Sequence, residues 1–132
     1  MDRKFWLGVA AYILPTFPLG YFWHLTIFAP QYHTLQMYRP DVIIPFGLLS
    51  MFVQAVLLSL LYPKIMRTDA SWLKQGLLFA LYAGLFAWSH STIAVAAKNV
   101  MTSVPLYVAL ETAFTALQYV IVGPLIALAH RK

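Results

Sequence analysis

Long apolar runs, separated by short polar stretches, make up most of the 132-residue chain. The four runs cover about residues 5–29, 42–62, 72–97 and 104–129. A helix needs about 20 apolar residues to cross the hydrocarbon core of a bilayer, so each run is long enough to span a membrane. The pattern predicts an all-α membrane protein in which residues 1–132 form a single integral membrane domain.

Residues that favour the start of a helix precede each of the last three runs. A short side chain at such a position can accept a hydrogen bond from a backbone N–H of the first turn. Pro105 follows one of these signals and suits the first turn of a helix. We expect Asp41 to cap the second helix, Asp69 or Ser71 to cap the third, and Ser103 to cap the fourth.

The composition also indicates a membrane protein. Hydrophobic residues make up 61% of the chain and charged residues 10%, against about 25% charged residues in a typical soluble domain. The net charge of +5 does not indicate a nucleic-acid partner, because the basic residues lie at the ends of the runs. The chain has no cysteine, which excludes disulfides and thiolate metal sites.

The distribution of Lys and Arg predicts the orientation. Seven of the nine basic residues fall on one side of the four runs, and only Arg39 and Lys98 fall on the other. Because cytoplasmic loops carry the excess of basic residues, both termini are expected to be cytoplasmic. The sequence thus predicts an antiparallel four-helix transmembrane bundle in a bacterial-type inner membrane. Its longest outer loop is Pro30–Asp41, where Tyr32 and Tyr38 suit a membrane interface.

A few polar side chains lie inside the apolar runs. Taking 1.5 Å per helical residue, His24, His90 and Glu111 all lie about 8–11 Å below the outer boundary. On the fourth run, Glu111, Thr115 and Gln118 follow the spacing i, i+4 and i+7 and form one polar stripe. We expect this stripe to face the interior, with Glu111 within hydrogen-bond reach of one of the two imidazoles.

Each of the other runs also carries a face with a polar residue. Small residues on such a face allow a neighbouring helix to approach closely. These faces are predicted to converge with the stripe of the fourth run. Their members are Phe17, Gly20, His24 and Phe28 on the first run, Gly47, Ser50 and Gln54 on the second, and Ala83, Ala87, His90, Ala94 and Ala97 on the third.

A faint internal repeat links the first and third runs. Gly20–Ile27 and Gly84–Ile93 share the order Gly, Phe, Trp, His, Thr, Ile, with two one-residue insertions in the second copy. Both runs would cross the membrane in the same direction, so the repeat would be parallel, as in some transporters. Chance similarity between two aromatic-rich helices is the alternative.

Glu111 is the residue that most needs an explanation. A charged carboxylate near the bilayer centre costs about 2.5–3.5 kcal/mol, so it must be paired, hydrated or protonated. One interpretation is a ligand- or proton-binding site, and the other is a buried carboxyl–imidazole bond that fixes helix register. The candidate ligand-binding residues are Glu111, His24, His90, Thr115, Gln118, Gln54, Trp23 and Trp88.

Metal and haem are further hypotheses for the same residues. His24, His90 and Glu111 are a plausible ligand set for zinc or iron, and the two imidazoles at equal depth could bind haem axially. No motif with close ligand spacing supports either group. Gln54 and Gln118 could instead bridge helices, and Trp23 and Trp88 could serve packing.

The function predicted from these features is the binding or transport of a small ligand, lipid or cation through the His/His/Glu cluster. The alternative is a non-catalytic accessory or assembly subunit of a larger membrane complex, and a metal- or haem-dependent membrane enzyme comes third. Catalysis is less favoured because Ser89 and Ser91 lie in no nucleophile elbow. We expect the chain to self-associate or to join a larger complex within the lipid bilayer. In size and number of spans it resembles the small multidrug transporters, but those carry their glutamate in the first helix.

Overall fold

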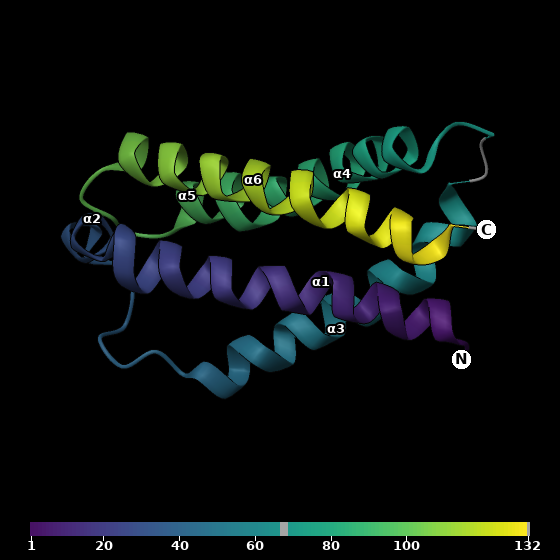
Figure 1. The fold of residues 1–132 in the computed structure, drawn as a ribbon. Coiled ribbons are helices and arrows are strands. Elements are labelled where there is room, and N and C mark those ends of the chain that lie inside the picture. Colours follow the sequence, from purple (N-terminus) through teal and green to yellow (C-terminus); the bar gives the residue numbers. More distant parts are fainter. Residues whose placement is uncertain (67–68, 132) are drawn as a thin grey trace.

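The computed structural model describes residues 1–66 and 69–131, and it is all-helical in these residues. Four helices are long and apolar enough to cross a membrane, over Arg3–Ile27, Ile44–Ile65, Trp72–Lys98 and Val104–His130. They run alongside one another, with both ends of the chain at the same end of the bundle (Figure 1). The predicted four-helix fold is confirmed, and the predicted spans agree with the observed helices to within a few residues.

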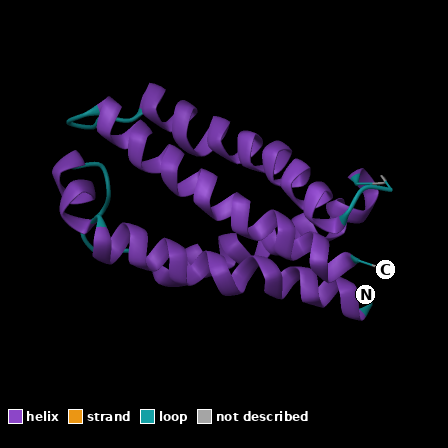
Figure 2. Cartoon of the chain, turned by 45° about the horizontal axis from the view of Figure 1, so that its top comes forward, coloured by secondary structure: helices purple, strands orange, loops and turns teal. Residues whose placement is uncertain are grey.

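Two of the four spans change helix type near one end, whereas α3 and α6 are continuous α-helices. The first and third spans each contain a short π-helical segment, η1 and η2. A cartoon view shows the helices joined by short connections (Figure 2). The elements are α1 (Arg3–Phe22), η1 (Trp23–Ile27), α2 (Ala29–Leu35), α3 (Ile44–Ile65), α4 (Trp72–Trp88), η2 (Ser89–Ile93), α5 (Ala94–Lys98) and α6 (Val104–His130).

The capping predictions were correct for two helices and wrong for one. Ser71 accepts from the backbone N–H of Lys74 at the start of α4, and Ser103 caps α6 in the same way. Asp41 does not cap α3, which begins after Ile43 without a side-chain cap in the described chain. The carboxylate of Asp41 instead pairs with the guanidinium of Arg39, 3.3 Å away.

The two π-helical segments fall on the faint sequence repeat. In η1 the N–H of Phe28 donates to the carbonyl of Trp23, and in η2 the N–H of Ala94 donates to that of Ser89. These are i→i+5 bonds, which define the π-helix and occur mainly as single turns inside α-helices. The repeated order of residues therefore coincides with a repeated local structure.

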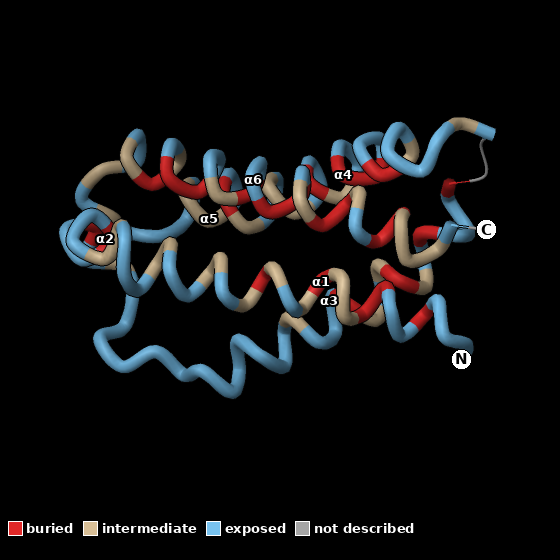
Figure 3. Tube along the Cα trace, in the orientation of Figure 1, coloured by how far each residue is buried: buried red, intermediate tan, exposed pale blue. Residues whose placement is uncertain are grey.

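The last helix, α6, packs against both α1 and α4, and α1 also packs against α3. The helices thus follow the order α3, α1, α6, α4. Burial concentrates along α6 and the helix faces turned toward it, while most of α3 is exposed (Figure 3). In a bilayer these exposed apolar side chains suit contact with lipid.

Glycines bring α4 and α6 into direct backbone contact. A Cβ atom added to Gly76 would lie 2.5 Å from the Cα atom of Pro124. A Cβ atom added to Gly123 would lie 2.3 Å from the carbonyl oxygen of Gly76. Without side chains at these two positions the helices can approach closely, as small residues allow in membrane bundles.

Candidate functional site

The polar stripe of α6 lies inside the bundle, as its spacing predicts. Glu111, Thr115 and Gln118 are 7%, 6% and 8% exposed, respectively. They lie on one side of the helix because residues at i, i+4 and i+7 share a face. The stripe therefore presents polar groups to the other helices rather than to lipid.

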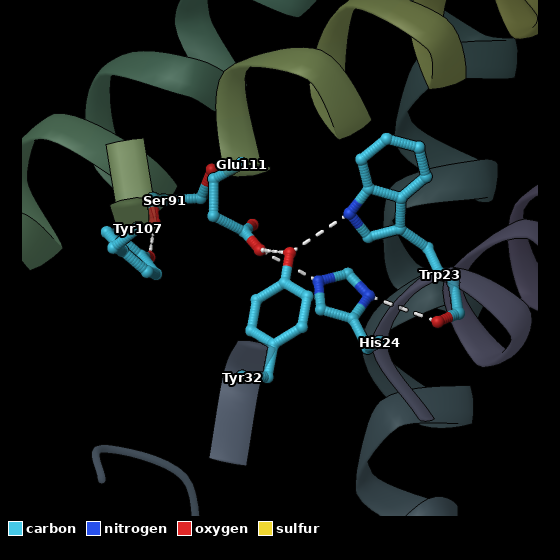
Figure 4. A network of polar contacts seen from close by, with 7 residues as sticks. Trp23, His24, Tyr32, Ser91, Tyr107 and Glu111 are labelled. Atoms are coloured by element: carbon cyan, nitrogen blue, oxygen red, sulfur yellow. Dashed lines mark hydrogen bonds and ion pairs between the residues drawn. The ribbon is translucent and has the colours of Figure 1, made fainter. Parts of the chain in front are cut away.

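Glu111 binds two side chains from the first span and the outer connection. The Nε2 atom of His24 lies 2.8 Å from Oε1 of Glu111, and the hydroxyl of Tyr32 donates to the same oxygen at 2.6 Å (Figure 4). The predicted contact between Glu111 and an imidazole is confirmed for His24. It joins the fourth span to the first at the level of η1.

The direction of each bond in this network follows from its neighbours. The carbonyl of Gly20 lies 3.0 Å from Nδ1 of His24 and can only accept, so Nδ1 carries a proton. The indole N–H of Trp23 can only donate, and it reaches the Tyr32 hydroxyl at 3.0 Å. The hydroxyl proton of Tyr32 is then free to point at Glu111.

These directions leave one proton between Nε2 of His24 and Oε1 of Glu111. The pair is either an imidazolium with a carboxylate or an imidazole with a carboxylic acid, and its net charge is zero in both forms. An unpaired charge at this depth would be costly, and the pairing removes that cost. Among the described residues, no side chain donates to the second carboxylate oxygen, Oε2, which keeps its capacity to accept.

Tyr32 is a site residue that the sequence analysis placed only at the membrane interface. The helix α2 turns its Tyr32 and Leu35 inward, and both are buried. Burial raises the pKa of the Tyr32 phenol, and its hydrogen bond to Glu111 raises it further. The phenol therefore stays protonated and continues to donate. The i, i+3 spacing of Tyr32 and Leu35 after Pro30 was the available signal.

A second polar network joins α1, α3 and α6 further along the bundle. The hydroxyl of Tyr12 donates to Oε1 of Gln54 and accepts from Nε2 of Gln118 at 3.1 Å. Gln118 also lies 3.5 Å from the hydroxyl of Thr16, and Gln54 donates to Ser50. Gln54 and Gln118 thus bridge helices, which was the alternative considered for them, and Tyr12 is a partner that sequence reasoning missed.

All four long helices contribute to one cavity of about 1100 Å³. Most residues of the predicted inward faces line this cavity, including Gly20 of α1, Gly47 of α3 and Ala87 of α4. The exceptions are Phe28, Ala94 and Ala97, which are not among the described lining residues. Most of its wall is apolar, and its polar residues come from different helices. It is lined by every polar residue proposed for the site, namely His24, Gln54, His90, Glu111, Thr115 and Gln118.

The side chains bonded to Glu111 do not include His90 or either of the two tryptophans proposed for the site. His90 lies on the cavity wall with its ring 5.4 Å from Phe86, and it makes no hydrogen bond in the described chain. Trp88 donates to Thr112 at 2.9 Å and lines a separate hollow of about 400 Å³ between α4 and α6. Neither Trp88 nor Trp23 is among the described residues that line the large cavity.

The proposed metal ligands are not assembled as a metal site in residues 1–66 and 69–131. These residues contain no group of three or more His, Cys, Asp or Glu side chains that could hold a metal ion. His24 meets Glu111, but both of its ring nitrogens already face protein acceptors. A metal ion or haem iron at His24 would have to displace one of these bonds.

Comparison with known proteins finds no match to this chain. No family model matches the chain, and no curated protein or solved structure matches it. A fold alone does not define a function, so the function has to be argued from the geometry of the site.

Proposed function

We propose that this protein binds a small lipophilic ligand inside the membrane, in the cavity that its four long helices line. The observation that carries the proposal is the convergence of polar residues from all four helices on one cavity of about 1100 Å³. Ligand pockets are commonly about 300–1,000 Å³, mostly apolar, with a few placed polar groups that orient the ligand. At about 1100 Å³ this cavity is slightly larger than that range, and its wall is likewise mostly apolar with a few polar groups.

Two polar groups on the wall retain the capacity to bind a ligand. Oε2 of Glu111 accepts no hydrogen bond from the described residues, and the His90 imidazole makes none to them. In the second network, by comparison, the Tyr12 hydroxyl is fully used, because it donates to Gln54 and accepts from Gln118. The open groups at Glu111 and His90 favour binding over bracing.

An accessory role in a larger membrane complex is the second candidate. It is favoured by the exposure of α3, of which only 11% of the most apolar window is buried within the chain. A partner helix could cover this surface as readily as lipid. The mass of the particle in solution distinguishes a complex from a lone chain.

A cavity-filling substitution tests the proposed function. A Cβ atom added to Gly47 meets no atom within 4 Å, and Gly47 lines the cavity, so Gly47→Phe should place an aromatic ring in the cavity and obstruct it. Val53→Phe is the matched control, because Val53 lies on the same helix, is 47% exposed and is not among the described lining residues.

The measurement is mass spectrometry of lipophilic molecules that copurify with each protein in native lipid nanodiscs. Wild type and Val53→Phe should carry a common molecule in near-stoichiometric amount, and Gly47→Phe should lose most of it. Equal amounts with all three proteins would overturn the proposed binding function. A stoichiometric protein partner in that case would support the accessory role.

A further inference from the structure

The cavity follows α3 for most of its length. It is lined by α3 residues from Ile44 to Leu61, which are about 26 Å apart at 1.5 Å per residue. The hydrocarbon core of a bilayer is about 30 Å thick, so one leaflet accounts for roughly 15 Å. An occupant that fills the cavity therefore reaches past the middle of the bilayer.

The wall along this length is mainly hydrocarbon. On α3 it includes Leu48, Leu57 and Leu58, and α4 contributes Phe86 on the other side. The helices α3 and α4 meet where Tyr62 packs against Phe79. They are not among the pairs that pack closely along their length, and the cavity lies between α3 and the other half of α4. A long, mainly apolar space of this kind suits an extended hydrocarbon chain.

The charged groups around the cavity are balanced in pairs. The titratable groups on its wall, apart from the tyrosines, are His24, His33, Arg39, His90 and Glu111. His24 pairs with Glu111 and shares one proton with it, and the guanidinium of Arg39 is held by Asp41. The other two, His33 and His90, are imidazoles rather than permanently charged groups.

A charged head group would therefore find no unpaired opposite charge on the wall of this cavity. An uncompensated charge buried in an apolar environment is strongly unfavourable. A neutral hydroxyl fits better, because it can donate to Oε2 of Glu111 and accept from the imidazole of His90. Both of those atoms are without a hydrogen-bond partner among the described residues.

Building on the proposed function, we propose that the ligand is a lipid with an uncharged hydroxyl head group and one long hydrocarbon chain. The head group binds beside Glu111 and His90, at the level of the π-helical segments. The chain runs along α3 toward Leu61. This inference names the ligand class, whereas the proposed function requires only that the cavity be occupied.

Four probes separate head-group charge from chain length. Hexadecanol, hexadecyl phosphate and hexadecyltrimethylammonium share one chain and differ in charge, and decanol shortens the chain of the neutral probe. Binding to the purified full-length protein is measured by native mass spectrometry. Specific binding is taken as the difference between wild type and Gly47→Phe. Hexadecanol should bind at least tenfold more tightly than each of the other three probes.

His90→Phe tests the head-group contact without touching the paired His24. Replacing the imidazole removes one neutral hydrogen bond, so hexadecanol binding should weaken on the order of fivefold. Thermal stability should stay at the wild-type value because His90 is exposed and makes no hydrogen bond in the described chain. The exposed Tyr82→Phe is the control and should leave binding unchanged.

The possible results distinguish the two proposals. Tighter binding of a charged hexadecyl probe would overturn the neutral-head inference while leaving a functioning cavity. Equal binding of decanol and hexadecanol would overturn the part that concerns chain length. If Gly47→Phe binds every probe as wild type does, the cavity is not the binding site and the proposed function fails as well.

Discussion

At the scale of single residues, the central feature is a carboxylate that uses one oxygen for two partners. Oε1 of Glu111 meets both His24 and Tyr32, and Trp23 stands behind Tyr32 as a donor. Because Trp23 can only donate and the Gly20 carbonyl can only accept, the chain of bonds has a fixed direction. The network therefore predicts that Nδ1 of His24 carries a proton and that the Tyr32 hydroxyl proton points at Glu111.

The protonation of His24 is the first prediction. Nδ1 should carry a proton at every pH at which the bundle is folded, because a neutral ring with its proton on Nε2 would turn a lone pair toward the Gly20 carbonyl. Nitrogen-15 chemical shifts of labelled His24 measure this directly. The opposite neutral tautomer would show that the direction assigned to the network is wrong.

Substitution of Glu111 is the second prediction. Glu111→Gln keeps an acceptor for Tyr32 but cannot share a proton with His24, so one interhelical bond is lost, at about 0.6 kcal/mol. Glu111→Leu leaves the Tyr32 hydroxyl and the imidazole without their partner, at about 1–3 kcal/mol. Unfolding by a denaturing detergent measures both losses.

The control for the Glu111 series is Val120→Leu, an exposed position on the same helix. It should unfold with the wild-type midpoint. A Leu variant at position 111 as stable as wild type would mean that the network contributes nothing to the fold.

The sequence predicted part of this network and could not predict the rest. Helical spacing and depth were enough to place Glu111 inward and near an imidazole. They could not choose His24 over His90, because both lie at the same depth and both of their spans pack against α6. The choice depends on which of the two imidazoles is turned toward Glu111. The spacing of Tyr32 and Leu35 could indicate an inward face, but it could not predict the contact with Glu111, which depends on how α2 folds back against the bundle.

At the scale of elements, the π-helical segments stand out because a side chain bonds to one carbonyl oxygen at each of them. The Gly20 carbonyl, one turn before η1, is bonded by the ring of His24. The Ser91 carbonyl, inside η2, accepts from the Tyr107 hydroxyl at 2.7 Å. A change from i→i+4 to i→i+5 bonding alters which backbone groups are paired. The Gly20 carbonyl also accepts from the backbone N–H of Trp23, so the His24 ring adds a second bond to it.

Tyr107→Phe is the third prediction, and it concerns η2. Without its hydroxyl the Ser91 carbonyl loses a buried partner, so the π-helical turn should open more often. Hydrogen exchange of the amides in residues 89–95 should speed up several-fold relative to wild type. Tyr82→Phe removes an exposed hydroxyl from the same span and should leave those rates unchanged; equal rates in Tyr107→Phe would contradict the prediction.

The contact between α4 and α6 gives the fourth prediction. Gly76→Ala places a methyl group 2.5 Å from the Cα atom of Pro124, which is backbone and cannot turn away. Overpacking of this kind costs about 1–3 kcal/mol. Gly47→Ala is the control, because its methyl group meets open space and Ala favours a helix by roughly 0.5–1 kcal/mol over Gly. Thermal unfolding should move in opposite directions in the two variants.

Hydropathy located the helices but not their irregularities. The spans and two of the three helix starts were predictable because apolar runs and Ser caps have direct local causes. The π-helical segments were not, since one extra residue per turn leaves the hydropathy of a span unchanged. The shared order His, x, Thr, Ile in His24–Ile27 and His90–Ile93 marked their positions, and its meaning emerged only with the structure.

At the scale of the whole molecule, both chain ends lie at one end of the bundle (Figure 1). Because the chain crosses the bundle four times, both of its ends must lie on the same side. The number of spans does not determine which side of the membrane that is. The distribution of Lys and Arg supplies that prediction, although two of the basic residues, Arg67 and Lys132, lie outside the described residues.

Orientation is the fifth prediction. Reporter fusions after Lys132 should be active in the cytoplasm, and fusions within residues 36–43 should be active on the outer side. The same reporters in both positions serve as mutual controls for expression. An outer-side reporter that is active after the C-terminus would reverse the predicted orientation.

The order of the helices around the bundle was not predictable from the sequence. Each of the four runs has a face with small and polar residues, so several arrangements could bury all four faces. Specific pairs decide among them, with Tyr12 and Gln118 joining α1 to α6 and Gly76 admitting the backbone of α6 to α4. Such pairs depend on shape at contact, which a pattern along one chain does not record.

The position of α6 between α1 and α4 has a consequence for how the protein is made. It leaves the ribosome after the other three long helices, yet it carries partners of His24 and Tyr12 in the first span. Until α6 inserts, His24 lacks Glu111 and Tyr12 lacks Gln118, and only their bonds to Gly20 and Gln54 are available within the chain. The first three long helices therefore enter the bilayer with incomplete hydrogen-bond networks, and the insertion of α6 completes both networks and forms the site.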